Sequence, residues 1–455
     1  MKYIVLSVIV AGLVSSVNAA EDLETMFSEG KVSGQIREFS ISRSYKKSVG
    51  TDYTRQANAI GGHLKFETAD YKGLSFGTAM YTTNGFLNDT PKDDYTKVDQ
   101  TLLGKDNNSY TILGEAYLQY KYSNTTFKGG RQKLDTPLAG SDDARMLPNL
   151  FEAYVLTNTD LENTTLVAAH VTRFAQGTFG RVYDASANSA NSILSATSGY
   201  SAVDTRNRVG DFVNMGEYAV GTSTNGVTAA AVIYTMNDYV KVQLWDYYAY
   251  DILNAIYGQV DLKWNCLLSD NVHPFFSAQV INENEVGDKL IGKLDGTYAA
   301  GKFGASVENF TAYIAYSQTS KNSASDISGA GNIGQKSAII TPWGGMPAYT
   351  QGMVTRHQFL AGTKASKIAA SYNWKSFGPD LKTVLYYTHF DMDNNNGYTY
   401  GNASESGFDF IYKPAMVKNL NLRLRGNFTD DYYVANTTGN TVAWNEYRFI
   451  VNYNF

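Results

Sequence analysis

The sequence predicts an all-β protein that spans a membrane as an antiparallel β-barrel of about 18 strands, with short periplasmic turns and long extracellular loops. Three observations lead to this prediction. The 455-residue chain begins with a segment typical of exported proteins, its side chains alternate in character every second residue over many short segments, and it ends on an aromatic-rich strand closed by Phe455.

The N-terminal segment has the features of a secretory signal peptide. Met1 and Lys2 precede an apolar run over 3–14, which is too short to span a bilayer as a stable helix. Small residues at Val17 and Ala19 match the positions that a signal peptidase reads. We therefore expect a signal peptide over 1–19 and a single barrel domain over 20–455. Downstream apolar stretches are interrupted within a few residues, which argues against membrane-spanning helices.

The composition favours many strands joined by polar turns. The chain contains 34 Tyr, 22 Phe and 40 Gly but only 8 Pro. Its one cysteine, Cys266, cannot form an internal disulfide, and we interpret it as a passive residue of the core or the lipid face. The formal net charge of -5 argues against a nucleic-acid partner.

The C-terminal segment 447–455 shows the alternation most clearly. One parity is almost wholly aromatic and apolar, and the other is mostly polar, as for a strand with one greasy face: Tyr447, Phe449, Val451, Tyr453 and Phe455 against Arg448, Ile450, Asn452 and Asn454. A soluble sheet could bury such a face in a protein core. Its terminal position resembles the signal by which outer-membrane barrels reach their assembly machinery, so we expect outer-membrane lipid and that machinery as partners.

The same two-residue rhythm recurs along the chain, for example over 256–264, 310–317 and 368–374. Helical spacing is not found. Segment 212–220 competes for a place among the 18 predicted strands, which are 31–42, 59–68, 73–82, 111–122, 126–132, 151–158, 163–173, 227–236, 252–264, 274–282, 297–305, 309–317, 355–363, 367–375, 381–390, 407–413, 419–428 and 445–455.

The predicted connections have two lengths, as expected for a barrel whose long loops all lie at one end. The links over 69–73, 122–125 and 158–163 are tight and contain Asn, Asp or Gly. The long connections are rich in Ser, Asn, Gly and Asp, and they cover 83–110, 133–150, 174–211, 318–354 and 391–406.

Basic residues within the strand pattern indicate what the interior of the barrel could do. In segment 420–428 the leucines share one face, and Arg423 and Arg425 share the other. A lipid-facing arginine near the bilayer midplane costs about 2–4 kcal/mol, so these arginines are expected to face the lumen. Arg448 and Arg37 fall on the polar parity of the last and first strands, which closure would bring together. The row would form a basic ladder able to guide anionic groups. Alternatively, they are ordinary lumenal residues paired with acidic loop residues.

The chain also resembles a known family, the OprD-type outer-membrane porins. The resemblance lies in segments 129–138 (GGRQKLDTPL), 143–151 (DARMLPNLF), 418–425 (KNLNLRLR) and 445–451 (NEYRFIV), and in their order and spacing. It implies an 18-stranded barrel, a lumen narrowed by inward-folded loops, and basic residues opposite acidic ones. It also implies uptake of small anionic or zwitterionic solutes that carry carboxylates, such as amino acids or organic acids.

The resemblance assigns site residues by position. The resemblance assigns Arg131, Arg423, Arg425 and Arg448 to the basic ladder, and the parity of the first strand adds Arg37. Arg131 shares parity with Phe127 and would need a bulge, or a position at the strand end, to turn inward. The constriction loop would include Asp135, Asp142, Asp143 and Arg145. Asp142 and Asp143 could supply the opposing negative charge, or they could be plain turn formers.

Catalytic and metal-binding patterns are weak in this sequence. The five histidines, at positions 63, 170, 273, 357 and 389, form no metal-ligand motif. Segment 391–397 has an acidic start like a calcium loop, but it lacks glycine at the sixth place and no glutamate follows at the twelfth. We therefore expect no enzyme activity and no cofactor. Three hypotheses stand in order: a solute-selective diffusion channel, a non-selective general porin, and a membrane enzyme or adhesin. The sequence leaves open whether the protein is a monomer or a homotrimer.

Overall fold

The computed structural model describes residues 20–86, 94, 97–104, 107–178, 210–321, 338–393, 396, 401–434 and 438–455. The predicted signal peptide lies outside these residues, as do parts of four predicted long loops, 83–110, 174–211, 318–354 and 391–406. Within the described residues, no helix combines the length and the apolar character needed to cross a membrane.

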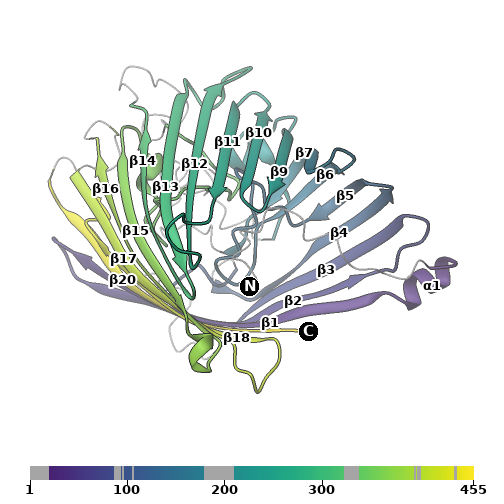
Figure 1. The fold of residues 1–455 in the computed structure, drawn as a ribbon, viewed down its shortest axis with the longest axis horizontal. Coiled ribbons are helices and arrows are strands. Elements are labelled where there is room, and N and C mark those ends of the chain that lie inside the picture. Colours follow the sequence, from purple (N-terminus) through teal and green to yellow (C-terminus); the bar gives the residue numbers. More distant parts are fainter. Residues whose placement is uncertain are drawn as a thin grey trace.

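The described residues form twenty strands in one antiparallel sheet (Figure 1). Eighteen of these strands are long, and the other two, β8 and β19, have two residues each. The strands are β1 (Lys31–Lys47), β2 (Tyr53–Glu67), β3 (Leu74–Gly85), β4 (Tyr110–Tyr122), β5 (Thr125–Gln132), β6 (Leu150–Asn158), β7 (Thr164–Ala175), β8 (Val213–Asn214), β9 (Val227–Asn237), β10 (Val240–Ala249), β11 (Leu253–Lys263), β12 (Val272–Glu285), β13 (Asp295–Val307), β14 (Phe310–Thr319), β15 (Lys364–Asn373), β16 (Leu381–Met392), β17 (Gly401–Tyr412), β18 (Leu420–Asp430), β19 (Tyr433–Val434) and β20 (Thr441–Asn454). The short helices are α1 (Leu23–Ser28), α3 (Met215–Val220), η6 (His357–Phe359) and η7 (Trp374–Phe377).

The sheet closes because the first strand pairs with both the second and the last. Glu38 of β1 lies opposite Ile60 of β2 on one side and opposite Val451 of β20 on the other. Closure leaves no strand edge whose backbone N–H and C=O groups would face hydrocarbon without a partner. The fold class predicted from the alternation is therefore confirmed, as are the number of long strands and the pairing of the first strand with the last.

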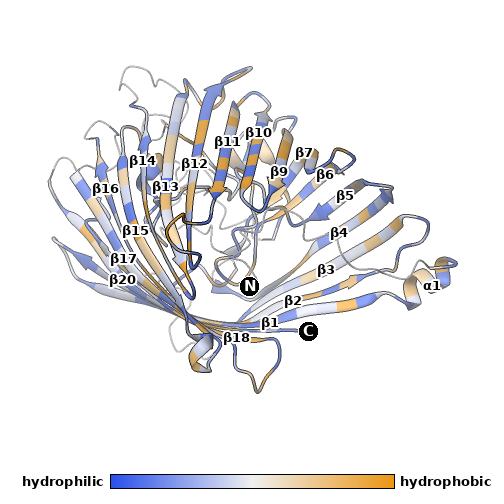
Figure 2. Cartoon of the chain, viewed as in Figure 1, coloured by the Kyte–Doolittle hydropathy of each residue, from blue (hydrophilic) through white to orange (hydrophobic). Residues whose placement is uncertain are grey.

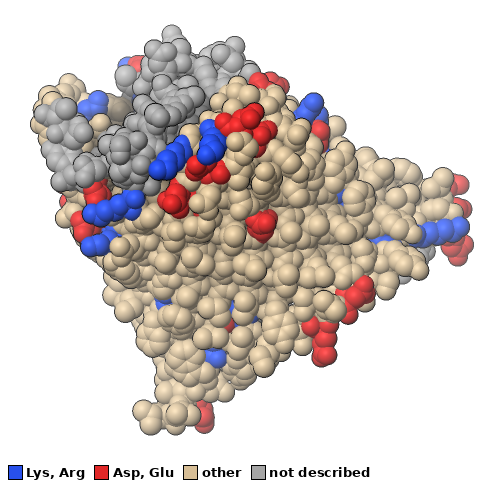
Figure 3. Space-filling view, turned by 90° about the horizontal axis from the view of Figure 1, so that it is seen from above, with Lys and Arg blue, Asp and Glu red and all other residues tan. Residues whose placement is uncertain are grey.

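Buried and more exposed residues alternate along strands such as β1 and β10. Hydrophilic and hydrophobic residues follow one another along many strands of the sheet (Figure 2). Ile314 on β14 and Ile368 on β15 lie opposite each other on the outer face and are 59% and 57% exposed. Outside a membrane, such exposure of large apolar side chains all round a barrel would be unfavourable. Figure 3 shows charged side chains gathered near the loop end of the visible face, above a broad band with few charges. This band is the expected lipid-facing surface.

Three strand predictions are corrected. Segment 240–249 is a strand that the alternation did not reveal, because Trp245 and Tyr247 face inward while Asp246 faces outward, so neither parity is uniformly apolar. Segment 355–363 is not a strand but part of a loop that contains η6. Its Phe359 and Leu360 are fully buried inside the barrel. Segment 212–220 is β8 followed by α3, whose first turn is capped by Asn214.

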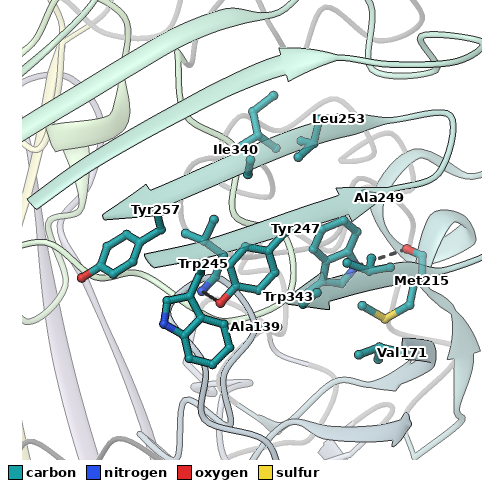
Figure 4. Close-up of a cluster of buried hydrophobic side chains, with 14 of the residues drawn as sticks. Ala139, Val171, Met215, Trp245, Tyr247, Ala249, Leu253, Tyr257, Ile340 and Trp343 are labelled. Atoms are coloured by element: carbon teal, nitrogen blue, oxygen red, sulfur yellow. Dashed lines mark hydrogen bonds between the residues drawn. The ribbon is translucent and has the colours of Figure 1, made fainter. Parts of the chain in front are cut away.

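Apolar residues inside the barrel hold the loops against one side of its wall (Figure 4). Trp245 and Tyr247 of β10 belong to one buried cluster with Leu138 and Trp343, which come from two loops. The indole N–H of Trp343 donates to the carbonyl of Met215 in α3 at 3.2 Å. One side of the lumen is therefore filled by packed loops.

A substitution on the outer face tests the orientation of the strands in lipid. Ile314→Arg is expected to destabilise the barrel by about 2–4 kcal/mol, because it places a charge near the middle of the apolar band. Gln318→Arg, on the same face of β14 but nearer the loops, is the control and is expected to cost about 0–1 kcal/mol. Urea unfolding of the two variants in lipid vesicles measures the difference, and equal stability would contradict the placement of the band.

Candidate functional site

Two loops fold into the lumen and meet there. We call residues 133–149, between β5 and β6, the first inner loop, and residues 338–363, before β15, the second inner loop. The backbone N–H of Gly140 donates to the carbonyl of Trp343 at 3.0 Å. The Arg356 guanidinium lies 3.4 Å from the carboxylate of Asp142, and both side chains are largely buried. The two loops thus narrow the passage together.

Side chains of the barrel wall hold the second inner loop at several points. Gln279 of β12 donates to the carbonyl of Pro347 at 2.8 Å and accepts from the N–H of Tyr349 at 3.2 Å. The Lys367 ammonium on β15 donates to the carbonyl of Gln351 at 2.6 Å. These contacts satisfy loop backbone groups that would otherwise be buried without partners.

The most extensive of these anchors is the carboxylate of Glu405, on β17, which is fully buried. It accepts from the backbone N–H groups of Met353 at 2.6 Å and Thr355 at 2.7 Å, and from the intervening N–H at 3.2 Å. The Tyr386 hydroxyl on β16 also donates to it. A side chain at Gly352 would lie 2.4 Å from the carboxylate, so glycine allows the close approach.

The second inner loop also reaches the connection that precedes β20. His357 lies 2.7 Å from the carbonyl of Tyr432 through Nε2, which must donate because the carbonyl oxygen can only accept. Burial lowers the pKa of His357 to about 4, so the ring is neutral at pH 7.

A buried ionic cluster holds the first inner loop. The Glu446 carboxylate on β20 lies 2.6 Å from Arg43 of β1 and 3.5 Å from Arg145 of the loop, and it also contacts Arg448. Arg43 reaches a second carboxylate, Asp99, at 3.1 Å. All five side chains are at most 1% exposed. Because water is excluded from this cluster, each buried charge is stabilised by its oppositely charged neighbours rather than by solvent.

The first inner loop is fastened at a second point by Arg37 of β1. Its guanidinium forms two hydrogen bonds with the Asp143 carboxylate, at 2.6 and 3.1 Å, and a third with the side chain of Asn452 at 2.8 Å. Burial alone would raise the pKa of Asp143, but the adjacent Arg37 charge lowers it below the ordinary value. The Asp143 side chain is 35% exposed, so this pair borders the open part of the lumen.

Cations exceed carboxylates on the lumenal face of β16–β18. Arg423 contacts Asp409 through two nitrogens, and Arg425 lies 3.3 Å from the same carboxylate. Lys382 is on the lumenal face of β16, two residues from Val384, which lies opposite Asp409. The Arg423 side chain is 31% exposed and that of Arg425 is 17% exposed. Two arginines therefore contact one carboxylate, and a lysine lies on the same lumenal face.

The structure places four of the five predicted ladder arginines on the lumenal face, but in different settings. Arg423 and Arg425 are partly accessible, whereas Arg37 and Arg448 are covered and hold the first inner loop. Among the constriction-loop residues, Asp135 accepts from Ser141 and closes a turn of the loop. Arg145, like Arg448, is a buried anchor.

Arg131 requires a correction. It lies opposite Ala116 and Glu152 on the outer face of the sheet, the face of Phe127, and its guanidinium is 3.7 Å from the Glu152 carboxylate. No bulge between Phe127 and Arg131 reverses the parity, so Arg131 does not belong to a lumenal row.

Sequence reasoning missed the carboxylates that organise the site. Glu446 shares the lumenal parity of Arg448, and that parity alone could have revealed it. Asp409 lies between Phe408 and Phe410 in β17, a pattern that also indicates an inward-facing charge. Glu405 had no comparable signal, because its partners are backbone groups of a distant loop. In the described part of the chain, no three His, Cys, Asp or Glu side chains cluster in a way that could hold a metal ion.

Comparisons with known proteins agree with the fold. Residues 25–455 match the family model described as "outer membrane porin, OprD family". This match covers most of the chain, which therefore belongs to the OprD family of outer-membrane porins, the proteins that form channels through that membrane. No curated protein matches it significantly.

Solved structures of this family have a similar fold. The structure of OccK9 (OpdG) from Pseudomonas aeruginosa has a TM-score of 0.74 at 18% identity, over 95% of this chain and 100% of that chain. OpdK from the same species, solved with vanillate, has a TM-score of 0.70 at 15% identity, over 94% and 99%. OccK2 (OpdF) from the same species, solved in complex with glucuronate, has a TM-score of 0.67 at 17% identity, over 94% and 99%.

The buried cluster gives a prediction for stability. Glu446→Gln removes the negative charge that Arg43, Arg145 and Arg448 share, which is expected to cost about 3–5 kcal/mol because buried cations are left without compensation. Glu308→Gln, in an exposed turn between β13 and β14, is the charge-matched control. Urea unfolding in lipid vesicles should show a large loss only for Glu446→Gln. Wild-type stability of that variant would contradict the role assigned to the cluster.

Proposed function

We propose that the protein is a passive channel with partial selectivity for small solutes that carry a carboxylate, and that these solutes pass along the lumenal wall of β16–β18. The observation that carries the proposal is the excess of positive charge on that wall, where Arg423 and Arg425 contact Asp409 and Lys382 lies on the same lumenal face. The partial exposure of Arg423 and Arg425 leaves donors available to a solute.

The physical basis is electrostatic guidance in a narrow passage. A cleft lined by one sign of charge can raise the local concentration of counter-ions by about 10- to 1000-fold. Guanidinium groups suit carboxylates because they can donate two parallel hydrogen bonds. The Asp143 carboxylate, which pairs with Arg37, is 35% exposed, so it is the acidic group that would meet the ammonium of a zwitterion.

The related structures support a carboxylate preference. Vanillate and glucuronate, the ligands in the OpdK and OccK2 structures, each carry a carboxylate group. The likeness at 15% and 17% identity concerns the fold, so these ligands suggest a chemical class for this chain rather than a particular solute.

A general diffusion porin is the second candidate. The pairing of Arg37 with Asp143 and of Arg423 with Asp409 favours it, because neutralised cations attract anions less. Glucuronate and glucose distinguish the two candidates, since they have similar size and differ in charge. Faster entry of glucuronate into proteoliposomes supports the selective channel, and equal rates support the general porin.

The selectivity of the wall is tested by removing its two arginine charges. In planar bilayers under a KCl gradient, Arg423→Gln combined with Arg425→Gln is expected to shift the reversal potential toward lower anion preference. The double substitution to Lys keeps both charges and is expected to keep the wild-type reversal potential. A wild-type potential in the Gln variant would refute the proposed role of these arginines.

A further inference from the structure

A row of charged side chains crosses the outer face of β5, β6 and β7 near the loops. Arg131 lies opposite Glu152, and Glu152 lies opposite Arg173, so the three residues occupy one register line across three strands. The same face carries Phe127 on β5 and Tyr154 on β6, which are 41% and 54% exposed. The row therefore points away from the lumen.

The row lies at the upper edge of the apolar band. β5 ends at Gln132, β6 begins at Leu150 and β7 ends at Ala175, so all three residues are within two positions of the loop ends of their strands. Directly below Glu152 on the same face are Tyr154 and then Leu156, which is 43% exposed. The lipid headgroups of the outer leaflet lie at this height, at the boundary between the apolar band and the loops.

The two arginines are only partly neutralised. Arg131 lies 3.7 Å and Arg173 lies 3.9 Å from the single Glu152 carboxylate, distances longer than those of direct charged hydrogen bonds. Their side chains are 37% and 54% exposed. The Arg131 guanidinium is positioned by the ring of Phe212, whose centroid is 4.3 Å away. The row thus carries one excess positive charge and donors that face outward.

We propose that Arg131 and Arg173 form a binding site for the phosphate-bearing headgroup of an outer-leaflet lipid. Arginine suits this ligand because its planar group can donate two parallel hydrogen bonds to phosphate oxygens. Phe127, Tyr154 and Leu156 below the row provide an apolar surface for the acyl chains. An apolar surface next to a cationic row fits a phosphorylated lipid better than free phosphate. This site is separate from the proposed solute pathway.

The role of Glu152 distinguishes lipid binding from a purely structural ion triad. If the row binds a phosphate, Glu152 competes with the lipid for both arginines, and Glu152→Gln should strengthen binding. If the three residues only hold the strand ends together, Glu152→Gln should release the arginines and give no gain. The two readings therefore predict different results for one substitution, a gain in binding or none.

The test titrates the full-length protein, folded in a neutral detergent, with lipopolysaccharide, and native mass spectrometry measures the bound fraction. Arg131→Gln combined with Arg173→Gln is expected to weaken binding by about tenfold or more, because it removes the charged hydrogen bonds to the phosphate. Glu152→Gln is expected to tighten binding several-fold. Lys413→Gln combined with Lys418→Gln removes the same charge at the periplasmic turn between β17 and β18 and is expected to bind as wild type.

Two further arms identify the ligand group. Dephosphorylated lipopolysaccharide is expected to bind the wild type as weakly as the native lipid binds the double arginine variant. Inorganic phosphate at millimolar concentration is expected to leave the lipid bound, and complete displacement would assign the site to free phosphate instead. Wild-type binding by the double arginine variant, or unchanged or weakened binding by Glu152→Gln, would overturn the proposal. Heat-modifiable migration on gels confirms that each variant is folded.

Discussion

The passage through this barrel depends on one buried carboxylate, that of Glu446. It meets guanidinium groups from the first strand, the last strand and the first inner loop, namely Arg43, Arg448 and Arg145. The contact therefore joins the closure of the sheet to the position of the loop that narrows it. Because an unpaired charge at this depth is costly, the loop has little freedom to leave the wall. Glu405 performs the same task for the second inner loop, with backbone N–H groups in place of arginines.

This arrangement also shapes the charge of the lumen. Two wall carboxylates, those of Glu405 and Glu446, are fully buried and bound to loop groups. Their charges are thus screened from the open part of the passage. On β16–β18, this leaves Asp409 as the carboxylate that accompanies the lumenal cations of the described residues. The anchoring of the loops and the positive character of that wall are two results of the same placement of acidic residues.

Alternation along the chain was sufficient to predict most strands and the lipid-facing surface, because lipid imposes one simple rule on every outward position. The alternation gave wrong predictions where apolar residues pack inside the barrel instead of facing lipid. Trp245 is apolar because it packs against loops inside the barrel, and the apolar residues of 355–363 are loop residues packed there too. The alternation correctly predicted that Arg423 and Arg448 face the lumen, but it could not predict that a loop covers Arg448. For Arg131, the family resemblance suggested the lumen, whereas strict parity with Phe127 agreed with the structure.

The central claim is that loops pinned to wall carboxylates set the width of the passage. Single-channel conductance of the Glu405→Gln variant in planar bilayers tests this claim most directly. The Glu405 carboxylate accepts hydrogen bonds from three backbone N–H groups of the second inner loop, and the glutamine side chain replaces one of its two acceptor oxygens with an NH2 donor. The expected result is a larger and more fluctuating conductance, while Tyr386→Phe, which keeps the carboxylate, stays near the wild type. A folded Glu405→Gln protein with wild-type conductance would contradict the account.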